Sequence, residues 1–484
     1  MNKNAKFKKT HPYTFVNHLK ISVILILLSL LQQFLIKPQS IPEIIGSLGI
    51  NALYVFAVLL YYTYSYGNYK YRLEKDGVHI KRGVFLDQDF ILPYHRIQTV
   101  VFYRDAVSSV FGAERISVDT PAGSRSKYDI TGYFTKKTAL RIKKLYKKGR
   151  TMHRVYRSRM ISIILMSAFW SNPLTGMIFI VPVINSAAKI TGSQFAQDII
   201  RGSLNPEWSP VAWIISPAAA GLATLILMCW LISALLYFLR YVRLRSSVLG
   251  ENIIISRGLI SKTITCTRIS AVSSVSIEHS LLMRLLRLRN CAVTVIGSGK
   301  LKGDKGLIVS AEYRESANKY MTELTGIPHD ETVRIDAAKG SIYSYVYYPC
   351  IYIILLTALS VLSYNFFPFN EAIWFLISVF YIILFWWLLF RIFACRHSHL
   401  GINEKALVVC TFKGLTLKKH YIPFDMIRKT EISQMFTQEK KGKCHLKVTI
   451  YGEKRLTYKI KQLPLKETKE LLLKAEMMRG KISD

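Results

Sequence analysis

Long apolar runs alternate with long polar segments along the chain. A helix needs about 20 apolar residues to cross the hydrocarbon core of a bilayer, and every run except the first exceeds that length. The pattern therefore predicts six membrane spans. Buried helices of a soluble protein are the alternative, which runs this long and this poor in charge disfavour. The six runs are 19–36, 44–66, 160–184, 211–239, 343–364 and 372–393.

The six runs fall into three pairs. Short or modest links at 37–43, 185–210 and 365–371 join the members of each pair, and a long polar segment follows each pair. A signal peptide would require a small-residue cleavage site after its apolar stretch, and none follows the first run. We therefore interpret the first pair as an uncleaved helical hairpin, like the two later pairs.

The basic residues are distributed unevenly between these connections. The chain has 484 residues and a formal net charge of +36, yet the links contain only Lys37, Lys189 and Arg201. Because cytoplasmic loops carry an excess of Lys and Arg, we expect both termini and all three long polar segments in the cytoplasm. The seven cysteines avoid the links and include no Cys-x-x-Cys pair, which fits a reducing compartment.

The long polar segments contain an internal repeat. The stretch "RGVFLDQDFILPYHRIQTV" (82–100) aligns without gaps with "RGLISKTITCTRISAVSSV" (257–275). A looser third copy, "KGLTLKKHYIPFDMI" (413–427), has one residue fewer between its Gly and its Pro. Repetition at this spacing indicates that one structural unit occurs three times.

The positions that recur in this alignment are apolar or conformationally restricted. His95 and Arg96 of the first copy do not recur, so we interpret "ILPYHRIQTV" (91–100) as a structural strand before assigning it any chemistry. The expected framework residues are Pro93, Ile97, Val272, Pro423 and Ile427.

The pattern of each copy predicts β structure followed by one helix. Segments such as "RISVDT", "AVTVIG" and "KVTIYG" alternate apolar and polar residues, which is typical of strands. Amphipathic patterns at 135–148, 314–326 and 464–478 then predict one helix at the end of each copy. Several short strands closed by a helix suggest a small barrel or sandwich.

The first copy, "RGVF…ILPYHRIQTV…SSVFGAERISVDTPAGS", resembles the bacterial pleckstrin-homology-like (PH-like) domain of membrane proteins. The arrangement of three copies and six spans resembles the YdbT-like proteins, which have a shorter single-module relative, YdbS. The resemblance implies a strongly bent, seven-stranded sheet closed by a C-terminal helix, with no catalytic residues and no cofactor. It also implies a bacterial plasma membrane, a YdbS-like partner, and a part in envelope maintenance or resistance to membrane-active compounds.

The expected fold class is a polytopic α-helical membrane protein whose six spans form three hairpins, carrying three cytoplasmic α+β PH-like domains. Each hairpin is expected to precede one domain, and the oligomeric state, homo- or hetero-oligomeric, stays open. The expected division is a basic leader with the first span pair (1–66), PH-like domain 1 (67–150), the second span pair (151–240), PH-like domain 2 (241–328), the third span pair (329–394) and PH-like domain 3 (395–484).

Basic residues supply the candidate binding contacts. A Lys or Arg precedes the turn Gly in every copy, and others mark the later hairpin loops. Near the cytoplasmic leaflet each such side chain can contribute about 1 kcal/mol of attraction to anionic lipid. We hypothesise contact with anionic lipid or an acidic partner; a positive-inside bias without specific binding is the alternative. The candidates are Arg82, Arg125, Lys127, Arg257, Lys300, Lys302, Lys305, Lys413, Lys454 and Arg455.

Other chemistry finds little support in the sequence. The loop "GSGKLKGDKG" (297–306) lacks the spacing of a phosphate-binding P-loop, and "CRHSH" (395–399) offers too few ligands for a closed metal site. No nucleophile or metalloprotease motif and no basic–aromatic nucleic-acid module stands out. We therefore predict a non-enzymatic membrane scaffold without metal, cofactor or nucleic acid. The alternative is a transporter or lipid-handling protein that uses the six-span bundle.

Overall fold

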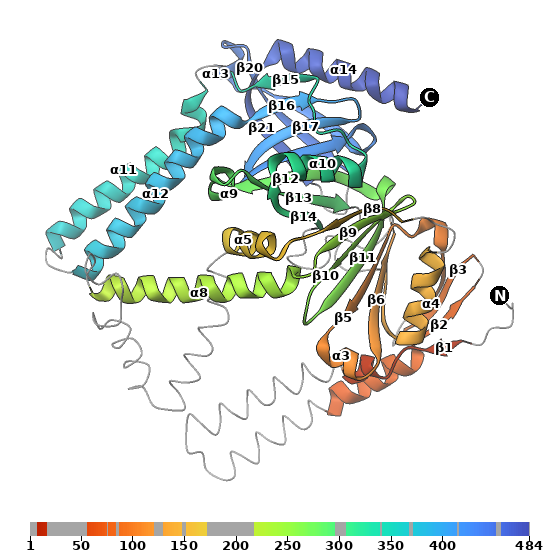
Figure 1. Ribbon diagram of the computed structural model, residues 1–484. Helices are drawn as coiled ribbons and strands as arrows, with labels where there is room; N and C mark the ends of the chain where they lie inside the picture. The colour runs from red at the N-terminus through yellow and green to blue at the C-terminus, as the bar shows by residue number, and fades with distance from the viewer. Residues whose placement is uncertain are drawn as a thin grey trace, which may run out of the picture.

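A computed structural model shows the architecture of the chain (Figure 1). It describes residues 7–16, 56–74, 76–83, 87–120, 129–147, 152–171, 217–295, 306–338, 341–366, 371–413, 416–451 and 456–483.

The described residues form four antiparallel sheets of 4, 7, 7 and 3 strands. The first has the order β1-β2-β3-β4 and the last the order β19-β20-β21. Their strands are β1 (Lys8–Lys9), β2 (Lys70–Leu73), β3 (Gly77–Arg82), β4 (Gln88–Pro93), β19 (Ile427–Ser433), β20 (Lys443–Ile450) and β21 (Leu456–Pro464).

The two large sheets have the orders β7-β6-β5-β11-β10-β9-β8 and β14-β13-β12-β18-β17-β16-β15. The first contains β5 (Thr99–Arg104), β6 (Ala113–Asp119), β7 (Ile130–Thr135), β8 (Met152–Arg157), β9 (Arg245–Leu249), β10 (Asn252–Arg257) and β11 (Lys262–Arg268). The second contains β12 (Val272–Ser280), β13 (Leu288–Val295), β14 (Gly306–Tyr313), β15 (Val333–Asp336), β16 (His399–Ile402), β17 (Ala406–Lys413) and β18 (Thr416–Pro423).

The strands belong to three similar modules, each with four strands, then three strands, then a helix. The first module is β1–β7 with α4 (Lys136–Lys147), the second is β8–β14 with α10 (Arg314–Thr325), and the third is β15–β21 with α14 (Leu465–Ser483). The three closing helices confirm the helices predicted at the end of each sequence copy.

A short 3-10 turn separates the fourth and fifth strands of every module. The turns are η1 (Tyr94–Arg96), η3 (Ile269–Ala271) and η5 (Phe424–Met426). The framework residues flank these turns: Pro93 and Pro423 directly precede them, and Ile97, Val272 and Ile427 directly follow. The alignment is therefore confirmed, although "ILPYHRIQTV" forms a strand, a turn and the start of another strand rather than one strand.

The modules are joined edge to edge by their strands. β5 of the first module pairs with β11 of the second, and β12 of the second pairs with β18 of the third. Val100 lies opposite Cys266 in the first junction and Val275 opposite Tyr421 in the second, which are equivalent positions relative to the 3-10 turns. Each seven-stranded sheet thus belongs to two modules, whereas the resemblance implied one bent seven-stranded sheet inside each domain.

The hydrophobic cores extend across these junctions. Cys266 of the second module packs in the core of the first. Val408 and Tyr421 of the third module pack in the core of the second, against residues such as Val275. Burial of apolar area is the main favourable term in folding, so these shared cores hold neighbouring modules together.

Apolar helices are inserted between the first two strands of a module. β8 pairs with β9 and β15 pairs with β16, although a helical segment separates the members of each pair in sequence. After each helical segment the chain therefore comes back to the same sheet and pairs with the strand that precedes the helices. The helices are α5 (Met160–Trp170) and α8 (Pro217–Tyr241), then α11 (Ile342–Phe366) and α12 (Glu371–His397). Figure 1 shows them extending from one side of the sheets.

The expected fold class, a six-span helical membrane protein, is wrong. The described chain consists mostly of antiparallel sheets, and only two of its helices, Ile342–Asn365 and Ile377–His397, are long and apolar enough to cross a membrane. The described part of α8 that passes as apolar, Leu225–Tyr241, is shorter. The run 19–36 and parts of 44–66, 160–184 and 211–239 lie outside the described residues. Long apolar runs produce a strong hydropathy signal, whereas short strands produce a weak one. A prediction based on hydropathy therefore overestimated the helical share of the chain.

Candidate anion-binding pocket

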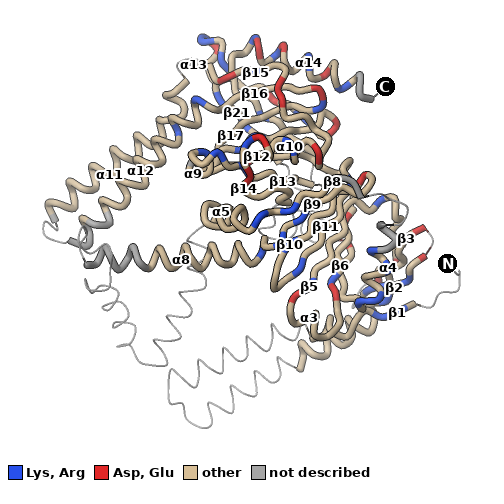
Figure 2. Tube along the Cα trace, viewed as in Figure 1, with Lys and Arg blue, Asp and Glu red and all other residues tan. Residues whose placement is uncertain are grey.

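A pocket of about 720 Å³ lies between the first two modules, where β5 and β10 end and β9 and β11 begin. It is beside the C-terminal end of α8, and Figure 2 shows Lys and Arg gathered around that end and the neighbouring strands. One acidic residue, Asp105, lines it. The basic residues of the lining are Arg104, Arg243, Arg245, Arg257 and Lys262.

Two of these cations face each other across the module junction. Arg104 ends β5 and lies directly opposite Lys262, the first residue of β11. Like charges at directly opposed positions of an antiparallel pair are destabilising. The junction therefore holds two positive charges where an anion would be favourable.

Arg243, in the connection between α8 and β9, and Arg245, the first residue of β9, both line the pocket. Arg243 has a φ of 60°, in the left-handed region that side chains with a Cβ seldom adopt. The backbone is held there because Leu244 N–H donates to the carbonyl of Tyr241 and Ser158 N–H donates to the carbonyl of Leu244, both at 3.1 Å. Such strain, of order 1 kcal/mol, clusters at functional sites.

The turn between β10 and β11 fixes Arg257 against α8. Its guanidinium carbon lies 4.9 Å from the ring centroid of Tyr241, and the residue is 6% exposed. The N–H of Gly258 donates to the carbonyl of Val242 at 2.9 Å. Gly258 has a φ of 97°, and a Cβ there would lie 1.9 Å from the Ser261 carbonyl oxygen, so this turn requires glycine.

The single carboxylate of the lining caps a helix. Asp105 is the N-cap of the short helix α3 (Ala106–Val110), and its side chain accepts a hydrogen bond from the N–H of Ser108 at 2.9 Å. The hydroxyl of Ser108 in turn accepts from the N–H of Asp105 at 3.0 Å. In this capping arrangement Asp105 is held by its own helix, and the lining has five basic residues for one acidic residue.

Exposed apolar side chains surround the pocket. Val110 of α3 is 84% exposed and Ile260 of the β10–β11 turn is 58% exposed, and both line the pocket. Val107, Phe111 and Leu259 are exposed beside them. An apolar rim around a basic pocket, next to the end of an apolar helix, is typical of a surface that contacts a membrane or a protein partner.

The structure brings one sequence-predicted candidate, Arg257, to this pocket. Arg82 lies elsewhere in the first module, where it donates to the carbonyl of Asp129 at 2.9 Å and to Gln88 at 3.0 Å. Lys413 ends β17. The remaining candidates, Arg125, Lys127, Lys300, Lys302, Lys305, Lys454 and Arg455, lie outside the described residues.

Sequence reasoning missed four of the five cations in the pocket. Arg243 and Arg245 occur in "LRYVRLRS", which the sequence analysis did not single out, and Lys262 follows the repeated Gly turn by a few residues. Arg104 comes from the other module. The dense basic stretch directly after an apolar run was the available signal.

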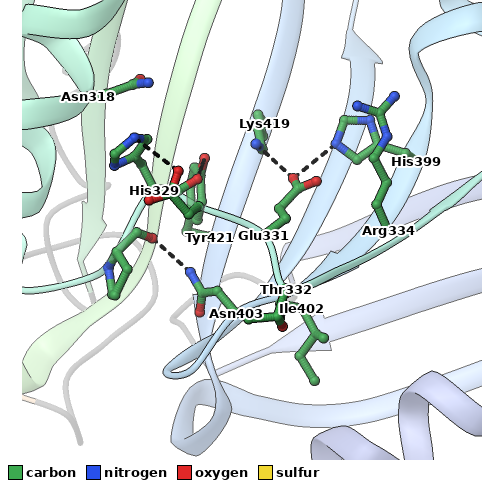
Figure 3. Close-up of polar contacts among 12 residues, drawn as sticks. Asn318, His329, Glu331, Thr332, Arg334, His399, Ile402, Asn403, Lys419 and Tyr421 are labelled. Carbon is green, nitrogen blue, oxygen red and sulfur yellow. Dashed lines mark hydrogen bonds and ion pairs between the residues drawn. The ribbon is translucent and has the colours of Figure 1, made fainter.

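A second polar cluster joins the second and third modules (Figure 3). Glu331, in the segment between α10 and β15, lies 2.7 Å from Lys419 Nζ and 3.1 Å from His399 Nε2. Burial opposes the charge on Glu331, but the hydrogen bond from His399 and the charge of Lys419 outweigh it and lower its pKa to about 2. Tyr421 and Asn403 donate to carbonyls of the same segment, at His329 and Pro328.

The two histidines of the "CRHSH" stretch lie in different environments, and only His399 belongs to this cluster. Burial would lower the pKa of His399, but hydrogen bonds with Cys410 and Glu331 raise it to about 9. His397 lies in α12, where its Nε2 is 2.9 Å from Arg284. The two imidazoles thus have separate partners, and among the described residues no group of three His, Cys, Asp or Glu side chains could hold a metal ion.

Comparison with known families identifies the repeated unit. The family model described as "Bacterial PH domain" matches the chain at residues 20–150, 204–321 and 351–476. Together these matches cover well over half of the chain, and each contains most of one module. A search of curated proteins and a search of solved structures each found no significant match.

Proposed function

This chain belongs to the bacterial PH domain family, and on that premise we propose that it is a membrane-anchored, non-enzymatic scaffold. PH-like domains are binding modules rather than catalysts as a rule, and function resides in the sites a fold carries. In this proposal the modules bind partner proteins or anionic lipid at the cytoplasmic face of a bacterial plasma membrane.

The observation that carries the proposal is the strand pairing between modules. Six residue pairs join β5 to β11 and six join β12 to β18. Modules linked by sheet hydrogen bonds and shared cores keep their surfaces in a constant relative position, unlike domains connected by flexible linkers. A scaffold needs that property, whereas a catalyst would need a cluster of reactive groups.

Anchoring is supported by the helices. Ile342–Asn365 and Ile377–His397 have the length and composition of membrane spans, and both ends of the α11–α12 pair meet one sheet through β15 and β16. The excess of Lys and Arg in the polar segments supports the cytoplasmic orientation.

Within the family, we propose kinship with the YdbT-like proteins and a YdbS-like single-module partner. Three modules separated by apolar segments support the first part. The outermost strands β4 and β19 support the second, because each lies at the end of its sheet and could accept a further strand from a partner or another copy. A role in envelope maintenance or resistance to membrane-active compounds would follow from such an assembly.

Labelling with a membrane-impermeant maleimide in intact cells tests the anchoring and the orientation. Lys137→Cys in the first module and Glu404→Cys in the third are exposed positions. Both variants should resist labelling until the cells are lysed, and the chain should stay in the membrane through an alkaline carbonate wash. The unsubstituted chain controls for its native cysteines. Labelling in intact cells, or release by carbonate, would contradict the proposal.

A further inference from the structure

We propose that the pocket between the first two modules binds the phosphate-bearing head group of an anionic phospholipid. The inference rests on the membrane-anchored scaffold proposed above and names the ligand class of one site in it.

The charge of the lining favours a phosphate. Arg104, Arg243, Arg245 and Lys262 have no carboxylate partner within the described part of the chain. Arginine binds phosphate oxygens through two parallel N–H donors, which makes it the preferred residue for this task. A phosphate between Arg104 and Lys262 would turn an unfavourable cross-strand pair into a bridged one.

The surroundings favour a lipid over free phosphate. Val110 and Ile260 project beside the cations and are largely exposed, and the pocket adjoins Tyr241 at the end of apolar α8. Acyl chains next to a bound head group would cover these side chains, whereas a free ion would leave them in water. A cavity of about 720 Å³ is within the ordinary size of ligand sites.

The equivalent position at the second junction has different side chains. His279 and Leu417 lie opposite each other where the first junction has Arg104 and Lys262. Arg284 of the short helix α9 (Leu281–Leu285) reaches α12, with its guanidinium carbon 4.6 Å from the ring centroid of Phe393. We therefore assign the head-group site to the first junction.

Native mass spectrometry of the full chain in a neutral detergent tests this assignment. The chain is mixed with equal amounts of phosphatidylglycerol and phosphatidylcholine, and bound lipids are counted. Arg245→Gln/Lys262→Gln removes two exposed cations of the pocket and should weaken phosphatidylglycerol retention about 30-fold, because about fivefold to sixfold is lost per charge. Lys136→Gln/Lys137→Gln removes two exposed cations on α4 and should change it less than about twofold.

A second variant keeps every basic side chain in place. Ser109 lies in α3 and lines the pocket, so Ser109→Glu should introduce a competing carboxylate and lower phosphatidylglycerol retention, while Ser109→Gln should not. Glycerol 3-phosphate, which has no acyl chains, should displace the lipid only weakly.

Three results would overturn the assignment. They are equal phosphatidylglycerol loss in the pocket and control variants, no difference between Ser109→Glu and Ser109→Gln, and displacement by glycerol 3-phosphate at stoichiometric amounts. A carbonate wash separates failure of the head-group assignment from failure of the scaffold proposal. If the variants stay anchored in the membrane and bind phosphatidylglycerol as the unsubstituted chain does, only the head-group assignment is contradicted.

Discussion

The two junctions between modules use the same strand pairing but differ in the side chains around it. At the first, Arg104 and Lys262 meet as like charges beside an open basic pocket. At the second, the buried carboxylate of Glu278 binds Lys418 of the facing strand at 2.5 Å, and Arg284 stacks on α12. The same backbone pairing thus occurs in two electrostatic settings. The second junction contains a buried ion pair, whereas the first is lined by cations that a ligand could neutralise.

Removing the ion pair at the second junction should have the largest effect on stability. Lys418→Met removes the ammonium group that lies 2.5 Å from the buried carboxylate of Glu278, and breaking a buried pair from one side typically costs about 3–5 kcal/mol. The melting temperature of the purified chain measures the loss. Lys447→Met is the control because its pair with Glu431 is partly exposed to solvent, so its melting shift should be much smaller. Equal melting shifts would contradict a structural role for the second junction.

The turn that forms the wall of the first pocket should tolerate no side chain. Gly258→Ala places a Cβ against the Ser261 carbonyl at a positive φ, and we expect a loss of more than about 2 kcal/mol. Gly112→Ala has the same sign of φ with nothing within 4 Å of its Cβ, so only about 1 kcal/mol should be lost. Thermal unfolding of both variants should rank them in this order, and the reverse order would rule out this account of the turn.

The stability of the junction between the second and third modules should depend on pH through His399 and Glu331. His399 has a folded pKa of about 9 against an ordinary 6.5, so its stabilisation is complete below pH 6.5 and disappears as the pH rises through 9. Glu331, with a pKa of about 2 against 4.5, stabilises above pH 4.5 and loses this as the pH falls toward 2. The junction should be most stable between about pH 4.5 and 6.5.

Stability measured against pH checks this window. Between pH 6.5 and 9 we expect a decline of about 1–3 kcal/mol, and His399→Gln should abolish that decline. A His399→Gln variant that declines as steeply as the unsubstituted chain would show that another group is responsible.

The smallest effect concerns the turn after the short helix of each module. The first and third modules have Gly112 and Gly442 there at positive φ, whereas the second has Arg287 with a φ of 57°. Arg287→Gly should therefore stabilise the second module by up to about 1 kcal/mol, visible as a small rise in melting temperature. A fall would indicate that the Arg287 side chain contributes more than its backbone strain costs.

Local features of the fold could be predicted from the sequence. The framework residues Ile97, Val272 and Ile427 occupy equivalent places beside the 3-10 turns, and the closing helices lie where amphipathic patterns placed them. These features depend on short-range preferences that each copy displays by itself. The family match supports the same repeated unit.

The junctions and the pocket could not be predicted in the same way. Nothing local indicates that β5 pairs with β11, since the two strands belong to different copies and pairing partners are chosen through shared burial. Arg104 and Lys262 are far apart in the chain and meet only through that pairing. Strands β8 and β15 were also missed because each closely precedes an apolar segment.

The pairing of β5 with β11 is the central claim, and a cross-link tests it directly. Val100 lies opposite the native Cys266, so Val100→Cys should form a disulfide with Cys266 when native membranes are oxidised, seen by mass spectrometry of unreduced peptides. Val101→Cys points to the other face of the sheet and should form none. A bond between positions 100 and 266 alone is the predicted result. Absence of that bond, or equal yields from both variants, would contradict the continuous arrangement of modules.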